Sequence, residues 1–201
     1  MVLAIYIYKK RKQNERSSFS INVSDEQPPT KWRGNAYNSR RITMDITVRR
    51  AEAKDIDKVS KLLSEVLEIH AKLRSDIFIS GTTKYTKEEL TNIFQNDDTP
   101  VFVAIDNDEV VGYAFCVIKK QPFSTNMVDF ETLYIDDLCV DEECRGKHVG
   151  TILYKHVLDY AKEIGCYDVT LNVWEGNDNA RAFYEKMGMF VKETQMEVIL
   201  K

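Results

Sequence analysis

The chain has 201 residues, of which 43% are hydrophobic and 30% are charged. This length is typical of one domain, or of one domain with a tail, and it is enough to bury a core without disulfides or metal ions. Eight glycines and four prolines exclude collagen-like chains and Pro/Gly-rich disordered chains. The net charge of −4, from 28 Lys and Arg against 32 Asp and Glu, argues against non-specific nucleic-acid binding, which requires a basic surface.

The cysteines and histidines predict neither a disulfide framework nor a metal site. The four cysteines form no C-x-x-C pair, and the three histidines form no H-E-x-x-H motif or zinc-type cluster. We therefore expect reduced thiols, a cytoplasmic protein and no bound metal.

The first 41 residues differ in charge from the rest of the chain. They contain nine Lys and Arg against three Asp and Glu, a net charge of +6, so residues 42–201 carry −10. The apolar run Val2–Tyr8 is too short to span a membrane, and its basic residues follow it, whereas those of a signal peptide come first. Residues 13–38 are polar and without period, which predicts disorder. Three interpretations of residues 1–41 stay open. They are a disordered basic tail, an extension ahead of a natural start at Met44, or an arm that binds a membrane surface or an acidic partner.

From residue 42 onward, hydrophobic periodicity predicts one domain of alternating strands and helices. The turn Asp106–Glu109 between two apolar runs indicates a β-hairpin, Thr86 begins a capping box, and Gly165 fits a helix C-cap. Asp55 is a candidate N-cap for the first helix. The expected strands are Asp45–Arg50, Val101–Ile105, Val110–Ile118, Glu131–Val140, Tyr167–Trp174 and Thr194–Leu200. The expected helices are Ile56–His70, Thr86–Phe94, Val149–Ile164 and Asn179–Met187.

The segment Tyr134–Tyr160 carries the most specific signal. A buried strand leads into a basic loop with two glycines, Gly146 and Gly150, and the loop opens an amphipathic helix. Unpaired N–H groups at a helix start, together with glycines that allow a close approach, suit a phosphate or pyrophosphate group. An ordinary strand-to-helix turn with solvated charges is the alternative. The chain has no G-x-x-x-x-G-K-[ST] loop and no G-x-G-x-x-G fingerprint after a first strand, which argues against P-loop and dinucleotide-binding proteins.

The chain resembles the GNAT superfamily of acetyl-CoA-dependent N-acetyltransferases. The family's cofactor loop, [Q/R]-x-x-G-x-[G/A] after a strand ending in D-L-x-V, matches Asp137-Leu138-Cys139-Val140 and Arg145-x-x-His148-x-Gly150. The family pattern N-x-x-A-x-x-F-Y-x-K-x-G matches in full, at Asn177, Ala180, Phe183, Tyr184, Lys186 and Gly188. His148 departs from the family by replacing the first loop glycine, and a side chain there crowds the pyrophosphate if the backbone requires positive φ.

The resemblance implies a fold and a co-substrate site. The fold is a mixed α/β GNAT fold, with a central, mostly antiparallel twisted sheet of about six to seven strands flanked by about four helices. The co-substrate is acetyl-CoA, with a pantetheine arm that pairs with a strand backbone. The implied acetyl-CoA-binding residues are Leu138, Cys139, Val140, Arg145, Gly146, Lys147, His148, Val149, Gly150, Thr151, Asn177, Tyr184 and Lys186.

The reaction requires a base, because a lysine-like amine with a pKa near 10.4 is neutral in roughly 1 molecule in 2,500 at pH 7. Asp136 is the first candidate, with Glu131 and Asp137 behind it, because Asp136-Asp137-Leu138 resembles the E-D-L of diamine and polyamine acetyltransferases in the superfamily. Strand geometry places Asp136 and Asp137 on opposite faces unless a bulge intervenes. The resemblance implies that Tyr184 is the general acid that protonates the leaving thiolate.

Several alternatives stay open. The acids around the expected cleft favour a small cationic amine as acceptor. A protein N-terminus or lysine side chain, and an amino acid or amino sugar, are the other acceptors, and a non-catalytic acyl-CoA sensor is a different class. We interpret Cys139, Trp174 and His70 as packing residues. Phe78, Tyr85, Asn172 and the loop Gln121–Phe130 are candidates for acceptor specificity. By resemblance, a homodimer is plausible.

Overall fold

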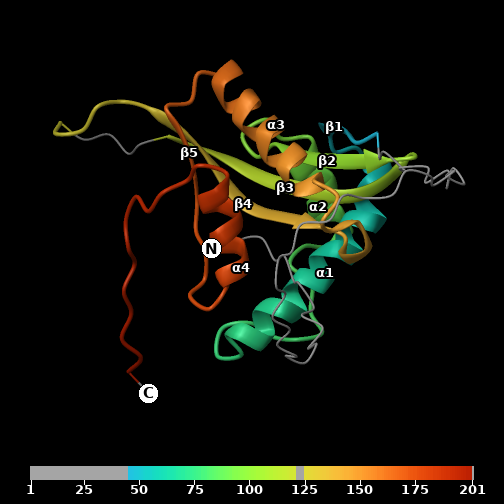
Figure 1. The fold of residues 1–201 in the computed structure, drawn as a ribbon, viewed down its shortest axis with the longest axis horizontal. Coiled ribbons are helices and arrows are strands. Elements are labelled where there is room, and N and C mark those ends of the chain that lie inside the picture. The colour runs from blue at the N-terminus through green and yellow to red at the C-terminus, as the bar shows by residue number, and fades with distance from the viewer. Residues whose placement is uncertain (1–44, 121–124, 201) are drawn as a thin grey trace, which may run out of the picture. The chain divides into compact units, whose positions relative to one another are not determined.

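The computed structural model describes residues 45–120 and 125–200. The predictions for residues 1–41 lie outside these ranges, and the domain boundary at residue 42 stays a prediction. The described residues form a mixed α/β unit with five strands, four α-helices and two short 3-10 turns (Figure 1). The predicted fold class is confirmed, although the described residues form five strands where six to seven were expected.

The strands form one sheet in the order β1-β2-β3-β4-β5. Neighbouring strands are antiparallel, except that β4 and β5 are parallel. Asn107 and Asp108 connect β2 to β3 with φ of 48° and 66°, the left-handed conformation that tight hairpin turns require, so the predicted hairpin is confirmed. The strands are β1 (Thr47–Arg50), β2 (Val101–Asp106), β3 (Glu109–Lys120), β4 (Glu131–Val140) and β5 (Asp168–Leu171).

The four predicted helices are present, with two of the predicted end signals. The Thr86 hydroxyl accepts a hydrogen bond from the Glu89 N–H while the Glu89 carboxylate accepts one from the Thr86 N–H, which is the capping box. Gly165 ends its helix with φ of 79°. Asp55 does not cap its helix as predicted, because its carboxylate accepts two hydrogen bonds from Arg49 at 2.7 and 2.9 Å. The helices are α1 (Ile56–Leu73), α2 (Lys87–Phe94), α3 (Val149–Glu163) and α4 (Asp178–Lys186).

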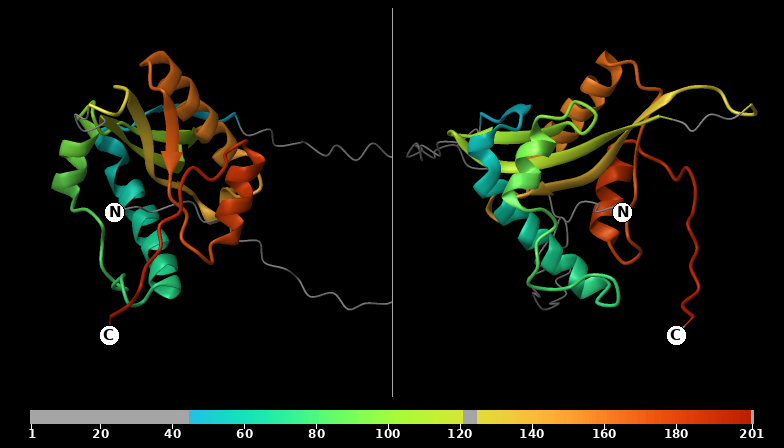
Figure 2. Two further views of the ribbon diagram at one scale, coloured as in Figure 1. Left: turned by 90° about the vertical axis from the view of Figure 1, so that its left-hand side faces the viewer. Right: turned by 180° about the vertical axis from the view of Figure 1, so that it is seen from behind.

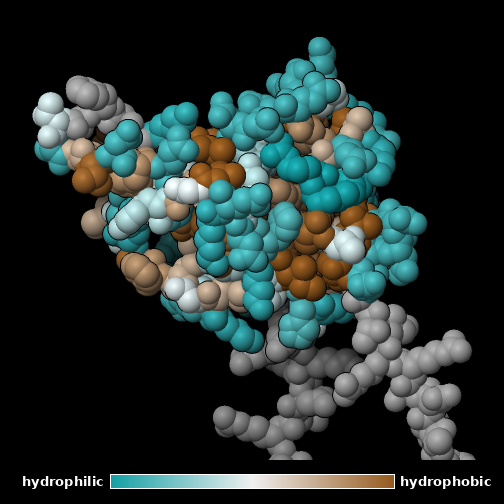
Figure 3. All heavy atoms as spheres, turned by 90° about the horizontal axis from the view of Figure 1, so that it is seen from above, coloured by the Kyte–Doolittle hydropathy of each residue, from teal (hydrophilic) through white to brown (hydrophobic). Residues whose placement is uncertain are grey.

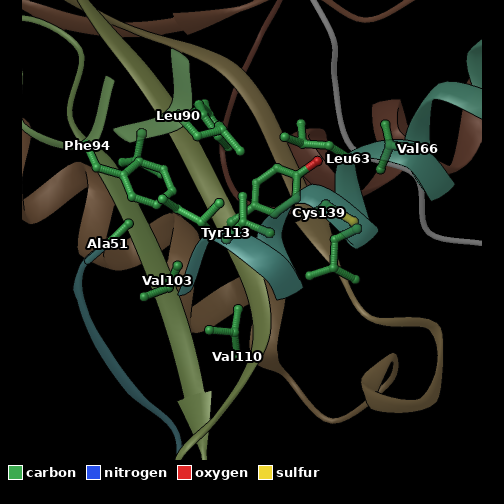
Figure 4. Packing of buried hydrophobic residues seen from close by; sticks show 14 of the residues in the cluster. Ala51, Leu63, Val66, Leu90, Phe94, Val103, Val110, Tyr113 and Cys139 are labelled. Atoms are coloured by element: carbon green, nitrogen blue, oxygen red, sulfur yellow. The ribbon is translucent and has the colours of Figure 1, made fainter. Parts of the chain in front are cut away.

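The alternating side chains of the sheet build two cores. Helices α1 and α2 cover one face, and α3 and α4 cover the other (Figures 1 and 2). In β3, Tyr113 and Phe115 pack toward α1 and α2, whereas Ala114 and Cys116 pack toward α3. Figure 4 shows Tyr113 in the middle of the first core, with its hydroxyl directed toward Leu63 and the neighbouring α1 residues. The central strands β3 and β4 are therefore buried on both faces, which places any polar group on them in a low-dielectric environment.

The predicted final strand, Thr194–Leu200, is wrong for this structure. Residues 188–200 have no regular secondary structure, and they leave α4 as an extended segment (Figure 1). The side chains of Phe190, Met196 and Leu200 are 87%, 89% and 92% exposed. The face drawn in Figure 3 is largely hydrophilic, and its apolar residues lie in separate patches. A run of exposed apolar side chains, as in residues 190–200, is unusual on the surface of a folded protein. A strand forms only where a neighbouring strand accepts its hydrogen bonds, and no described strand lies beside this segment.

Gly112 on β3 lies where no side chain fits. A Cβ atom there would lie 2.7 Å from the carbonyl oxygen of Cys139 and 3.1 Å from the side chain of Leu153. We expect Gly112→Ala to lower the free energy of unfolding in urea by about 1–3 kcal/mol. Gly150→Ala is the matched control. Its Cβ would meet Val140 and Phe183 at 3.5 and 3.6 Å, which is ordinary contact, and alanine favours a helix by about 1 kcal/mol. Equal stabilities of the two variants would contradict this packing.

Candidate active site

Strands β4 and β5 separate in the middle of the sheet. Their parallel ladder runs from Thr132 and Asp168 to Ile135 and Leu171 and ends there. In the described part of the chain, the β5-facing edge of β4 therefore has no strand partner over residues 136–140. Such an edge presents backbone N–H and C=O groups to an extended ligand, as in β-augmentation. Leu138, Cys139 and Val140 lie on this edge with buried side chains, so their available polar groups are those of the main chain.

A β-bulge occurs where the two strands separate. The register between β3 and β4 shifts between Phe115 and Cys116, which pair with Asp137 and Ile135 and leave Asp136 without a cross-strand partner. The bulge also changes where the two carboxylates point. Asp136 binds Lys84 from the connection between α1 and α2, and Asp137 binds the hydroxyl of Tyr113, which packs toward these helices. Both carboxylates therefore have partners on the same side of the sheet, whereas regular alternation predicts opposite sides.

Asp136 forms an ion pair with Lys84, which lies in the connection between α1 and α2. The Lys84 Nζ donates a hydrogen bond to the Asp136 Oδ2 at 2.5 Å. The two side chains are only 17% and 13% exposed. Burial lowers the pKa of Lys84, but the carboxylates of Asp137 and Asp136 raise it by more, so the pKa lies above its ordinary value. The candidate base therefore holds an alkylammonium group in this structure.

Asp137 is fully buried beside Asp136. Its Oδ2 accepts a hydrogen bond of 2.7 Å from the Tyr113 hydroxyl, and its Oδ1 accepts no hydrogen bond from the residues that the structure describes. Burial raises the pKa of Asp137 to about 7, although Lys84 and the Tyr113 hydroxyl act in the opposite direction. A buried carboxylate with a pKa near neutrality is a candidate for proton transfer.

The loop between β4 and α3 has the conformation of an anion-binding turn. Gly146 and His148 have φ of 77° and 66°, and a Cβ at Gly146 would meet no atom within 4 Å. His148 and Lys147 are exposed, and α3 begins at Val149 with free N–H groups in its first turn. The Nε of Arg145 donates to the Val140 carbonyl at 3.2 Å, which ties the loop to the end of β4. This open cradle at a helix start fits the pyrophosphate of acetyl-CoA, and the adjoining edge of β4 fits its pantetheine arm.

His148 is strained in this loop. The left-handed conformation costs a residue with a Cβ about 1–2 kcal/mol, and glycine avoids most of that cost. We expect His148→Gly to raise the melting temperature by about 2–4 °C in thermal unfolding followed by circular dichroism. The exposed side chain of His148 makes no hydrogen bond that the substitution would break among those the described residues form. A lower melting temperature for the variant would show that the backbone strain is compensated by contacts of the imidazole.

Helix α4 contributes a buried tyrosine and a capping asparagine. The Asn177 side chain accepts a hydrogen bond from the Ala180 N–H at 3.3 Å, so it is the N-cap. Tyr184 is 3% exposed and packs against Phe183 and Tyr154, with ring centroids 5.3 and 6.0 Å away. Both residues are thus held in fixed positions by α4.

Glu131 lies apart from this group. It is at the opposite end of β4 and pairs with Lys120 at 3.4 Å; it is five positions from Asp136, roughly 17 Å at about 3.3 Å per residue. Thr151 is half-buried in the first turn of α3 next to the loop, and Lys186 is exposed on α4.

The residues interpreted as packing are part of the first core. His70 is fully buried with its ring centroid 5.3 Å from that of Phe78, and Trp174 meets Phe78 edge-on at 5.7 Å. Burial raises the pKa of the Cys139 thiol well above its ordinary value, which disfavours a thiolate nucleophile.

Sequence reasoning missed three residues of this site. Lys84 stands in a polar loop with no motif around it, and Tyr113 and Gly112 stand in an apolar strand. Period-two alternation places Tyr113 on the same face as Phe115, but only the ladder register brings its hydroxyl to Asp137.

Comparison with known proteins identifies the class. Residues 65–189 match the family model described as "Acetyltransferase (GNAT) family". The crystal structure of a mutant of the BH1408 protein from Bacillus halodurans is similar to this structure, with a TM-score of 0.74 and 31% sequence identity. The match covers 77% of this chain and 99% of the BH1408 chain. The chain belongs to the GNAT acetyltransferase family.

Curated relatives include enzymes with different named acceptors. Glucosamine 6-phosphate N-acetyltransferase of Arabidopsis thaliana is 40% identical over 63 residues, which is 31% of this chain and 40% of the relative. An uncharacterized N-acetyltransferase of Methanocaldococcus jannaschii is 27% identical over 73% of this chain and 62% of its own length. The peptidyl-lysine N-acetyltransferase YjaB of Salmonella typhimurium is 28% identical over 74% of this chain and 86% of its own length. The chain therefore spans less than two thirds of the first two relatives.

Proposed function

We propose that the protein is an N-acetyltransferase that moves an acetyl group from acetyl-CoA to a primary amine by direct attack. The observation that carries this proposal is the bulge in β4. It places the carboxylates of Asp136 and Asp137, with an ammonium group already bound, at the point where β4 and β5 separate. The family match supports the same reaction class.

The residues that would hold acetyl-CoA are those of the β4 edge and of the loop before α3. The main chain of Leu138–Val140 would pair with the pantetheine arm, and the N–H groups of residues 146–151 would bind the pyrophosphate. Lys147 adds positive charge beside that loop, and Asn177 and Lys186 are further contacts implied by family resemblance. The bound co-substrate supplies an acetyl group activated as a thioester.

The bulge carboxylates would accept the proton of the attacking amine. Asp136 binds an ammonium group, so it is the base in this proposal, and the buried Asp137 sets the charge around it. Tyr184, buried on α4, is the general acid that protonates the leaving thiolate in this proposal. Glu131 has no geometric support for a role here, because it lies at the far end of β4.

The acceptor in this proposal is a small cationic amine with an alkylammonium group. The ion pair between Lys84 and Asp136 supports this acceptor, since an alkylammonium group lies against the proposed base. A lysine side chain of another protein presents the same group and is the second candidate, favoured by the likeness to a peptidyl-lysine acetyltransferase over 74% of this chain.

Two measurements test this proposal. Acetyl-CoA binding is measured by calorimetry, and CoA release is then followed across a panel of polyamines, amino sugars, amino acids and lysine peptides. Binding with turnover on an alkylamine is the expected result. Binding without turnover on any amine would favour the acyl-CoA sensor, and no binding would overturn the assignment.

We also propose that the protein is a homodimer formed through the free edge of β5 and the segment Thr194–Leu200. Four residues of the segment, Met196, Val198, Ile199 and Leu200, have exposed apolar side chains, and β5 pairs only with β4 among the described strands. A strand from a second copy would satisfy that edge and bury these side chains. Light scattering is expected to give a dimer for the full chain and a monomer for a chain truncated after Lys192. A monomeric full chain would contradict the proposal.

The cytoplasmic location stays a prediction. No helix in the ranges 45–120 and 125–200 is long and apolar enough to cross a bilayer.

A further inference from the structure

We propose that Lys84 is an internal acyl acceptor, which becomes acetylated on its Nζ when acetyl-CoA is bound and no amine substrate is present. The inference rests on the proposed acetyltransferase function and extends it to a modification site on the chain itself.

The first observation is the position of the amine. The Lys84 Nζ lies 2.5 Å from the Asp136 Oδ2, at the bulge where β4 leaves β5. An acceptor amine must occupy this place to give its proton to Asp136. Lys84 therefore stands where an alkylamine substrate would stand, and the substrate must displace it.

The second observation is that Lys84 is unlike the other lysines. Its side chain is 17% exposed, whereas the exposed fractions of Lys58, Lys87 and Lys162, which also form ion pairs, are 33%, 72% and 76%. Lys84 also lies 5.1 Å from the centre of the Tyr85 ring. Both contacts hold the side chain against Asp136 and reduce the entropy lost on reaching a reactive geometry.

The chemistry balances without any further reactant. The Lys84 ammonium gives one proton to the Asp136 carboxylate, and the neutral amine attacks the thioester carbonyl. The new C–N bond forms and the C–S bond breaks. The leaving sulfur becomes the thiol of CoA with a proton from the Tyr184 hydroxyl, which the proton held on Asp136 then replaces. A second proton leaves the nitrogen for solvent, and the product is a neutral amide.

Acetylation of Lys84 has a consequence for the site. It removes the positive charge that competes with a cationic substrate for Asp136.

The experiment uses the full chain and acetyl-CoA without added amine. Intact mass spectrometry is expected to show a gain of one acetyl group, which peptide mapping assigns to Lys84. Lys84→Arg keeps the positive charge and is expected to lose this modification, and Asp136→Asn is expected to slow it by about 10-fold or more. Lys87→Arg, on an exposed lysine three residues further along, is the matched control and is expected to keep it.

A second measurement does not depend on acetyl transfer. Binding of butylamine to the protein without acetyl-CoA is followed by calorimetry, and we expect Lys84→Ala to bind it about 10-fold more tightly, because no internal ammonium then occupies Asp136. Equal binding would overturn the placement of Lys84 at the acceptor position.

The outcomes separate this inference from the proposed function. Turnover on an external amine with no acetyl group on Lys84 would overturn the inference alone. Acetylation spread over exposed lysines, unchanged in Asp136→Asn, would show non-enzymatic transfer and would also overturn it. Absence of acetyl-CoA binding would remove the proposed function and the inference together.

Discussion

Asp136→Asn is expected to reduce kcat/KM for acetyl transfer by about 100- to 10,000-fold, the range typical of a lost general base. The amide cannot take the proton of the attacking amine, and it removes the charge that binds the ammonium group. Asparagine has nearly the same size as aspartate, so the bulge in β4 and the packing around it are expected to survive. Steady-state kinetics with the best amine from the panel measures the effect.

The control for this variant is Asp57→Asn on α1. The Asp57 carboxylate is 81% exposed and pairs only with Lys87 among the described contacts, so its loss is expected to leave kcat/KM within about twofold. Circular dichroism establishes that both variants fold. A kcat/KM for Asp136→Asn within about threefold of the original chain would exclude Asp136 as the base and would turn attention to Asp137 or a bound water.

Asp137→Asn is expected to change how the free energy of unfolding depends on pH. Burial raises the pKa of this carboxyl from 3.8 to about 7 in the folded protein. Between these values the folded protein holds a proton that the unfolded chain has released, so stability falls as pH rises from about 4 to about 7. Asparagine does not titrate, and it still accepts the hydrogen bond from Tyr113.

The measurement is urea unfolding of both proteins at pH 4.5 and pH 8. The stability of Asp137→Asn relative to the original chain is expected to rise by up to about 3 kcal/mol between these two pH values. Asp57→Asn is expected to show no such change, since its carboxylate is in water. Parallel pH profiles for Asp137→Asn and the original chain would mean that Asp137 titrates near its ordinary pKa.

The same pair of residues predicts a pH effect on activity. If the ionised Asp137 supports proton transfer at Asp136, kcat/KM rises with pH through about 7. The rise in kcat/KM near pH 7 is then absent in Asp137→Asn. The activity profile and the unfolding profile then report one titrating group.

Local signals in the sequence were sufficient for the family, most of the elements and the loop before α3. The capping box at Thr86, the hairpin turn at Asn107-Asp108 and the C-cap at Gly165 each depend on residues a few positions apart, and the structure contains all three. The two motifs around Arg145 and Tyr184 are also local, and they were enough to name the GNAT family.

The tertiary structure alone decided the details of the candidate site. The β-bulge that gives Asp136 and Asp137 partners on the same side of the sheet depends on the register between β3 and β4, which no short pattern encodes. Lys84 reaches Asp136 across 52 positions of the chain.

The C-terminal segment also shows that local sequence signals and tertiary contacts decide different features. The predicted strand at Thr194–Leu200 is wrong for this structure, because a strand exists only where another strand completes its hydrogen bonds. The sequence by itself thus determined which local conformations each segment favours and which family it joins. The fold decided which distant groups meet, because contacts between residues far apart depend on how the whole chain packs.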